Sequence, residues 1–395
     1  MSSAFGDDIE VVGVGMHPFG RFTGSSLKDL NRVACVSALV DAGLGVQDVD
    51  GVYAANAMAG LLQGQEMIRG QSVMREIGIE RVPVTNVENA CASGSTALRQ
   101  AVLAIRAGSA DVVLVSGVEK MFVEDRSRTL AALESAGDLD VVSGIGLQFT
   151  AVYGMRLRKL IAAGRLTVDD LVAVSVKSHA NGSLNPYAQH RKVVTPEEVL
   201  GSRPIADPLT LLMCSSICDG AASVVLARRG AVPSVGRPTV RVRASQAATG
   251  YTTTGTEPSL TETCAAAAYE EAGLGPEDVD IAEVHDAMAP AELIAYEHLG
   301  FCGPGDAGAL LGSGATQIDG SRPVNPSGGL SSRGHAVGAT GLAQVAELTW
   351  QLRGEATGRQ TRRPRVGLAH NNGGWLEGES AVSCVHLLER TDPWD

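Results

Sequence analysis

Hydrophobic and polar positions along the first 120 residues alternate between short apolar runs and amphipathic stretches. Continuous apolar runs are typical of parallel strands buried on both faces, and the stretches between them have helical spacing. Gly43 and Gly108 stand where two of these helices would end. The pattern predicts an α/β fold, with strands at 9–14, 50–54, 82–87 and 111–117 and helices at 27–42, about 65–77 and 96–107.

The chain repeats a short segment at an offset of 230 residues. Residues 42–50, AGLGVQDVD, recur at 272–280 as AGLGPEDVD, and Ala57-Met58 recurs as Ala287-Met288. Each copy follows an apolar helical stretch and leads into a strand pattern. Matching contexts at one offset favour duplication of a whole structural unit, while the alternative is a turn that often ends helices.

A stretch of different composition separates the two copies. Residues 120–203 are rich in Gly, Asn, Pro and charged residues, and they predict an inserted loop domain rather than a further sheet. Residues 219–226 return to the composition of a buried strand. The predicted organisation is a first half at 1–119 and 204–235, a loop domain at 120–203, and a second half at 236–395.

Charge and composition exclude several classes of protein. The net charge of −12 argues against a nucleic-acid partner, because phosphate binding needs a basic face, although a local basic pocket stays compatible with a nucleotide tail. No apolar window approaches a membrane span, and no basic and apolar leader is visible, so a cytoplasmic location is expected. The seven cysteines form no Cys-x-x-Cys pair, which favours reduced thiols and no metal site.

Cys91 is the first candidate for chemistry. It lies in the segment 88–96, ENACASGST, which joins a predicted buried strand to a helix. Backbone N–H groups and the dipole at the start of a helix favour a thiolate, and the same N–H groups can hold an oxyanion. The alternative is an inert buried cysteine, which is the commoner role of this residue type.

Three histidines are candidates for acid–base chemistry. His285 follows the predicted strand 279–284, and His335 lies in the glycine-rich loop that leads into the predicted helix 342–352. His370 follows the predicted strand 366–369 and would open a turn. Each could be a structural histidine, yet three of them at such strand-end and loop positions, with Cys91 at another, form a more specific set. A metal site is less attractive, because the ligands would come from separate loops.

These segments together resemble the thiolase superfamily, nearest to its sterol-carrier-protein type and bacterial relatives. The resemblance covers essentially the whole chain. It rests on the nucleophile motif at 86–95, the loop-domain segment 185–199, His285-Asp286, the GHAVGATG run at 334–341, and His370-Asn371. The resemblance implies a duplicated α/β fold of two βαβαβαββ halves in five αβαβα layers, with an inserted loop domain and a dimeric assembly.

The resemblance also implies roles for the candidate residues. Cys91 would carry the acyl group, and His335 would take the thiol proton and later help to bind a thioester oxygen. His285 would complete that oxyanion hole, and the backbone amides of Cys91 and Gly373 would form a second one. His370 would be an acid–base group, since the ordinary pKa of histidine is near neutral.

This chain departs from the family pattern at three positions. Classical thiolases have a second cysteine where His370-Asn371 stands, and sterol-carrier-type enzymes have one where Ala287 stands. Ala336 replaces a usual proline. Acyl transfer through Cys91 is therefore expected, whereas ordinary reversible thiolysis of acetyl-CoA esters lacks its usual second cysteine.

Three functions fit this picture. The first is an acyl-CoA C-acyltransferase that cleaves or forms a β-ketoacyl-CoA, with CoA and acyl-CoA as substrates and no covalently bound cofactor. The second is a retro-aldolase acting on a CoA ester with a small zinc-ribbon and OB-fold partner protein. The third is a non-catalytic carrier of lipid or acyl-CoA, which the combination of one cysteine and three histidines makes the least favoured.

Overall fold

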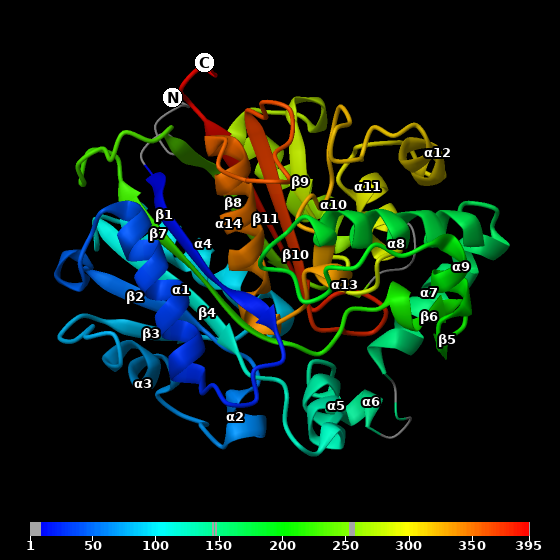
Figure 1. Ribbon diagram of the computed structural model, residues 1–395, viewed down its shortest axis with the longest axis horizontal. Coiled ribbons are helices and arrows are strands. Elements are labelled where there is room, and N and C mark those ends of the chain that lie inside the picture. Colours follow the sequence, from blue (N-terminus) through cyan, green and yellow to red (C-terminus); the bar gives the residue numbers. More distant parts are fainter. Residues whose placement is uncertain (1–8, 144–145, 147, 253–256, 395) are drawn as a thin grey trace.

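The computed structural model describes residues 9–143, 146, 148–252 and 257–394. The ends of the two predicted halves, 1–8 and Asp395, lie outside these residues. The described strands of both halves form one hydrogen-bonded series in the order β3-β2-β4-β7-β1-β8-β11-β10-β9 (Figure 1). They are β1 (Ile9–Gly20), β2 (Gly51–Ala55), β3 (Val84–Val87), β4 (Val112–Glu119), β7 (Asp219–Arg228), β8 (Val240–Thr249), β9 (Ile281–Glu283), β10 (Val366–Gly373) and β11 (Val382–Arg390).

The two halves repeat the same pairing pattern, as the recurring segment predicted. In the first half β2 is parallel to β4, and β7 is antiparallel to both β4 and β1. In the second half β9 is parallel to β10, and β11 is antiparallel to both β10 and β8. One pair of residues, Glu10 and Arg241, joins the two sets of strands. The predicted duplicated α/β fold is confirmed.

The repeated segment performs the same structural task in each half. Gly43 and Gly273 end their helices in the left-handed conformation, with φ of 68° and 66°. A side chain would be strained at this φ, so glycine suits both positions. The Asp50 carboxylate accepts from the N–H of Val112, and Asp280 accepts from that of Val366, at 2.9 Å in each case. Each aspartate therefore attaches the end of its copy to the neighbouring central strand.

Helices form layers around and between the strands. The helix α14 contacts β7 of the first half and β10 of the second, and it also packs on α4, so these two helices form the central layer (Figure 1). Outside, α1 packs on β1 and β7, while α10 packs on β8 and β11. The helices of the halves are α1 (Leu27–Ala42), α2 (Ala59–Gln63), α3 (Arg69–Arg75), α4 (Ser93–Arg106), α10 (Leu260–Ala272), α11 (Ala291–His298), α12 (Ala307–Gly312), α13 (Gly329–Ser332) and α14 (Thr340–Arg353).

The segment between the halves is helical and covers one end of the strands (Figure 1). Its short strands β5 and β6 pair with each other and contact α7 and α9, so the insertion continues beyond residue 203 towards β7. Its elements are α5 (Arg126–Glu134), α6 (Leu139–Val142), α7 (Phe149–Ala162), α8 (Val168–Ser183), α9 (Pro196–Gly201), β5 (Pro204–Ala206) and β6 (Leu209–Thr210).

Several boundaries differ from the sequence predictions. The helix α1 has the predicted bounds, Leu27–Ala42, because Ser26 caps its start and Gly43 ends it. The helix predicted at about 65–77 is present but shorter, as α3 at Arg69–Arg75, and another short helix, α2, precedes it. The strand predicted at 366–369 continues to Gly373, since its partner β11 keeps pairing with it. His370 therefore lies within a strand and not in a turn.

We predict that Gly15→Ala destabilises the fold by about 1–3 kcal/mol, the usual cost of overpacking. A Cβ at this position would lie 2.3 Å from the carbonyl oxygen of Ala34 and 2.5 Å from the amide nitrogen of Ala38, both backbone atoms of α1. The matched control is Gly24→Ala, where a Cβ meets nothing within 4 Å. Denaturant unfolding measures both variants, and equal midpoints would contradict the prediction.

Candidate active site

A cavity of about 590 Å³ brings together residues from both halves and the helical insertion. Cys91 enters from the start of α4, His285 from the loop after β9, and His335 from the loop before α14. Tyr153 of α7 and Gly373 at the end of β10 line the same cavity. Three of the four side chains singled out in the sequence therefore share one cavity.

Cys91 lies in a tight turn that leads directly into α4. The preceding residue, Ala90, has a φ of +49°, which is rare for a residue with a side chain and costs of order 1–3 kcal/mol. Two local hydrogen bonds hold this backbone. The N–H of Ala90 donates to Glu88 at 2.7 Å, and Ser93 Oγ donates to the Ala90 carbonyl at 2.7 Å. Such a strained turn is common at functional sites.

The environment of Cys91 favours the thiol and not the thiolate. Burial raises the pKa of Cys91 to about 12, and the nearby Glu119 carboxylate acts in the same direction. The backbone N–H groups of Cys91 and Gly374 lower it, but by less. The expectation that the helix start alone would stabilise a thiolate is therefore wrong, because desolvation dominates. Cys91 needs a base to become a nucleophile.

His335 has the hydrogen bonds of such a base. Its Nδ1 lies 2.7 Å from Thr340 Oγ1, and that hydroxyl donates its proton to the carbonyl of Ala336 at 3.1 Å. Thr340 must therefore accept from Nδ1–H, which leaves Nε2 of His335 unprotonated. Burial and the neighbouring Arg333 charge lower the pKa of His335 to about 3, so the ring is neutral at pH 7.

His285 has the opposite tautomer. Asn371 Nδ2 lies 2.9 Å from its Nδ1, while Asn371 Oδ1 accepts from Ser95 Oγ at 3.2 Å. The amide orientation makes Nδ1 of His285 an acceptor and places the proton on Nε2. Burial lowers the pKa of His285 well below its ordinary value, and His335 adds to this effect. The two rings lie 5.3 Å apart at 80°, one presenting an acceptor and the other a donor.

His370 does not line this cavity. Its Nδ1 accepts from the backbone N–H of His285 at 3.5 Å, and its Nε2 lies 3.1 Å from Asn372 Oδ1 and 3.2 Å from Thr261 Oγ1. Burial lowers its pKa to about 4. The ring lies instead on a small chamber of about 30 Å³ behind His285. The sequence predicted that His370 begins a turn after the strand 366–369, but the pairing of β10 with β11 keeps it in the strand and places the ring among these partners.

The turn after β10 supplies backbone groups to the cavity. A Cβ on Gly373 would lie 2.5 Å from the Asn89 carbonyl oxygen and 2.8 Å from the Ala92 nitrogen, so only glycine fits against the Cys91 turn. The backbone group that bonds towards the Cys91 thiol belongs to Gly374. This is one residue beyond Gly373, the residue that the resemblance indicated.

Glu119 is a polar residue of this region that the sequence reasoning missed. It ends β4 fully buried, and its carboxylate accepts from the N–H of Ala57 at 2.5 Å and from Asn56 Nδ2 at 3.1 Å. Burial raises its pKa to about 7. Its effect on Cys91 is electrostatic. The one signal in the sequence was a carboxylate at the end of an otherwise apolar buried run.

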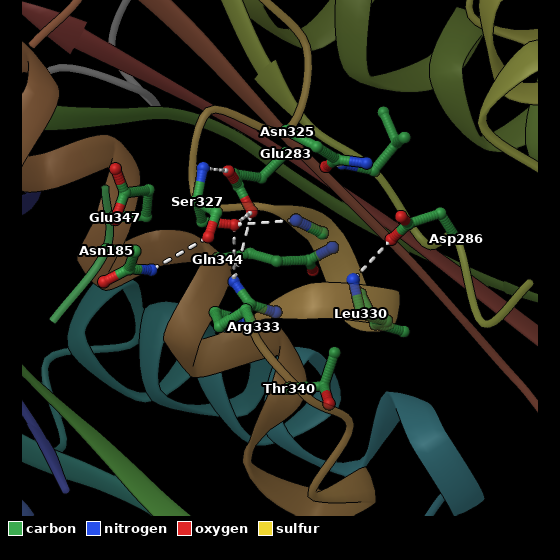
Figure 2. A network of polar contacts seen from close by, with 12 residues as sticks. Asn185, Glu283, Asp286, Asn325, Ser327, Leu330, Arg333, Thr340, Gln344 and Glu347 are labelled. Carbon is green, nitrogen blue, oxygen red and sulfur yellow. Dashed lines mark hydrogen bonds and ion pairs between the residues drawn. The ribbon is translucent and has the colours of Figure 1, made fainter. Parts of the chain in front are cut away.

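A buried polar network connects the two chain segments that carry the cavity histidines, and Figure 2 shows its residues Glu283, Ser327 and Arg333. Arg333 Nη1 lies 3.1 Å from Glu283 Oε2, and both side chains are fully buried. Glu283 also accepts from Ser327 Oγ at 2.7 Å and from the Ser327 N–H at 3.0 Å. Asp286, next to His285, accepts from the N–H of Leu330 at 2.8 Å. These contacts join the segment after β9 to the loop that carries His335.

The described residues contain no group of three or more His, Cys, Asp or Glu side chains that could hold a metal ion. None of the described helices combines the length and the apolar character needed to span a membrane. The described cavity offers the Cys91 thiol, two neutral imidazoles of opposite tautomer and backbone donors, and a second cysteine, Cys214, also lines it. That set suits nucleophilic acyl chemistry.

Two family models match this chain. A model described as thiolase, N-terminal domain, matches residues 9–230, and one described as thiolase C-terminal domain-like matches residues 244–386. An acetyl-CoA acetyltransferase of Methanothermobacter thermautotrophicus is 39% identical over 388 residues, covering 97% of this chain and 100% of the relative. Human sterol carrier protein 2 is 34% identical over 383 residues, covering 92% of this chain and 69% of the relative.

Solved structures share the fold at lower identity. Human mitochondrial 3-ketoacyl-CoA thiolase superposes with a TM-score of 0.74 at 18% identity, covering 98% of this chain and all of the other. An Ltp2-ChsH2(DUF35) aldolase superposes with a TM-score of 0.82 at 24% identity, covering 98% and 99%. Both likenesses establish the architecture alone.

The pKa of Cys91 leads to a prediction on its reactivity. Since the thiolate is the reactive form and the pKa is raised to about 12, alkylation of Cys91 by iodoacetamide should keep accelerating from pH 7 to pH 10 without a plateau. Peptide-level mass spectrometry measures the rate. A plateau below pH 8 would show instead that the resting enzyme holds a thiolate.

Proposed function

Because the chain belongs to the thiolase family, we propose that it is an acyl-CoA C-acyltransferase that cleaves or forms a β-ketoacyl-CoA through a thioester on Cys91. The chain is an acyltransferase of the thiolase type. The observation that carries the finer proposal is the shared cavity of Cys91, His285 and His335, in which the two imidazoles present an acceptor and a donor.

In the cleaving direction, the first step forms the acyl-enzyme. His335 Nε2 takes the proton of Cys91 as the sulfur attacks the β-keto carbon of the substrate. Charge develops on the keto oxygen, which the backbone N–H groups of Cys91 and of the turn at 373–374 stabilise. The bond between the α and β carbons then breaks, leaving the acyl group on Cys91 and an enolate of the departing CoA ester.

The enolate needs a hydrogen-bond donor and a proton. The Nε2–H of His285 donates to its thioester oxygen, and the proton that His335 took from Cys91 passes to the α carbon.

In the second step the thiol of free CoA gives its proton to His335 and attacks the thioester. The Cys91 sulfur leaves and recovers that proton. This cycle balances without a second cysteine, which suits the presence of Ala287.

His370 acts on this chemistry through His285 rather than on the substrate. Its ring accepts from the backbone N–H of His285 and bonds the Asn372 side chain, so it orients the segments on both sides of the donor imidazole. We therefore assign it a positioning role in place of the direct acid–base role that the sequence indicated. Its burial, with neither ring nitrogen on the main cavity, supports this assignment.

A retro-aldolase reaction on a CoA ester, with a small zinc-ribbon and OB-fold partner, is the second candidate. The missing second cysteine favours it, and an aldolase is among the structures of similar fold. That reaction needs an enolate site and an acid–base group but no acyl-cysteine. The retained pair of Cys91 and His335 in one cavity favours acyl transfer.

We also propose a cytoplasmic homodimer. The strand β3 lies at one edge of the sheet series, where its backbone can pair with a second copy. Beside it, the loop between α2 and α3 exposes Met67 and Ile68, at 78% and 62% of their full area. Apolar side chains next to an open sheet edge are typical of an interface.

We predict that Cys91→Ala abolishes the acyl adduct that intact-mass spectrometry detects after incubation with acetyl-CoA, because the backbone N–H groups of Cys91 and Gly374 lie at the Cys91 thiol, while Cys214, the other cysteine of this cavity, lies outside that turn. The variant should keep the wild-type unfolding midpoint. Cys302→Ala is the matched control, since this half-buried cysteine lies outside the main cavity. An adduct that persists on the Cys91→Ala protein would reject the proposal.

A second prediction distinguishes a positioning role of His370 from a direct acid–base role. His370→Ala should lower acylation and overall turnover together, by about tenfold or more, because both depend on His285. His370→Asn should recover part of that loss, since its side-chain oxygen can accept from the His285 N–H in place of Nδ1. Single-turnover acylation and α-proton exchange in deuterium oxide measure the two steps. If both variants keep wild-type acylation but lose α-proton exchange, His370 has the direct acid–base role and the positioning role is rejected.

A further inference from the structure

A second cavity of about 550 Å³ lies directly beside the catalytic one. The two share Phe149 and Tyr153 of α7 and the residues Gly374 and Ser380 that border the turn after β10. Much of the second cavity is apolar, and this part is formed by Val152, Met155, Leu160, Leu166, Leu293 and Ile294. A chain that starts at Cys91 and passes Tyr153 would enter an apolar space.

Two cations on α7 line this second cavity without an acidic partner. Arg156 and Lys159 make no hydrogen bond or ion pair among the described residues. Arg165, which also lines the cavity, is paired with Glu297. The other carboxylate of the wall, Glu379, accepts from the backbone N–H groups of Leu260 and Ser380. The cavity therefore holds three cations against two carboxylates, and Arg156 and Lys159 bond neither carboxylate.

Arg156 is the more notable of the two cations, because it is half-buried. A guanidinium that has lost part of its hydration, with no carboxylate or carbonyl bonded to it, is poised to bind an anion. Lys159 lies three residues further along the same helix, close to the same face, and is exposed. The other titratable ring here, His298, is neutral, since burial lowers its pKa to about 4.

The catalytic cavity has cations of its own. Arg126 of α5 and Arg203 line it from the insertion, and neither has an ion-pair partner among the described side chains. They can serve the phosphates of CoA, so the cations of the second cavity are free for another anion. A β-ketoacyl-CoA bound at Cys91 extends in two directions from the reacting carbon, towards CoA and towards the end of the acyl chain.

We propose that the second cavity holds the distal part of the acyl chain and that Arg156 and Lys159 bind a carboxylate at its end. The preferred substrates are then β-ketoacyl-CoA esters of dicarboxylic type. This inference rests on the proposed acyltransferase function and adds its substrate class. The apolar wall takes the methylene groups, and the two cations contribute charge-assisted hydrogen bonds at the far end.

Tyr153 stands between the two cavities. Burial raises the pKa of its phenol to about 12, so the hydroxyl is neutral, and no hydrogen bond joins it to another described residue. The face of an aromatic ring at this point favours methylene groups passing beside it. The approach to Arg156 and Lys159 from Cys91 therefore suits an acyl chain.

The test compares β-ketoacyl-CoA esters of equal length that end either in a methyl group or in a carboxylate. The wild-type enzyme should show higher kcat/KM for the carboxylate esters at one or more lengths. Arg156→Ala and Lys159→Ala should each remove about tenfold or more of that kcat/KM, the usual effect of losing a charge-assisted bond, and change the methyl esters less than about twofold. Arg158→Ala is the matched control, because Arg158 lies on the same helix, bonds Asp207 and does not line the cavity.

Two outcomes would overturn the proposal. Equal losses on both kinds of ester, with a raised KM for free CoA, would assign the second cavity to CoA phosphates. Equal kcat/KM values of the wild-type enzyme for carboxylate and methyl esters of every length would reject the carboxylate site. Calorimetric binding of the same esters to Cys91→Ala separates this result from failure of the proposed function. If the Cys91→Ala protein binds the carboxylate esters more tightly than the methyl esters, the carboxylate site is supported even when no acyl-enzyme forms. If it binds both kinds of ester equally, the carboxylate site is rejected, whichever reaction the enzyme catalyses.

Discussion

The buried ion pair between Arg333 and Glu283 is the contact on which the geometry of the site depends. Glu283 ends β9, two residues before His285, and Arg333 lies two residues before His335. Their side chains meet at 3.1 Å with no exposure to solvent, and Ser327 completes the arrangement. Removing one partner of such a pair leaves an uncompensated buried charge, at a cost of about 3–5 kcal/mol. The pair therefore holds both cavity histidines in one relative position.

The same pair influences protonation. A guanidinium charge behind the two rings opposes a further positive charge on either, and burial acts in the same direction. Both imidazoles are consequently neutral, and their tautomers follow from their outer partners, Thr340 and Asn371. A neutral pair with one acceptor and one donor can move a proton and stabilise a developing negative charge in a single cavity.

Duplication explains how residues so distant in sequence come together. The paired halves place α4 and α14 side by side in the central layer, so the starts of both helices meet at one end of the molecule. Cys91 precedes the first helix and His335 precedes the second. The helical insertion then covers this end and supplies α7, whose residues line both large cavities. The symmetric framework thus positions the chemistry, and the asymmetric insertion shapes the space for the substrate.

The sequence by itself determined the features that depend on local pattern. Apolar runs and helical spacing indicated alternating strands and helices, the repeated AGLG segment indicated the duplication, and the motif at Cys91 indicated a turn at a helix start. Tertiary structure decided what depends on burial and on partners far along the chain. Desolvation beside Glu119 turned an expected thiolate into a thiol, and the pairing of β10 with β11 placed His370 behind the cavity. Neither effect is visible in a local window, because the dielectric environment of a side chain and its direction are properties of the packed molecule.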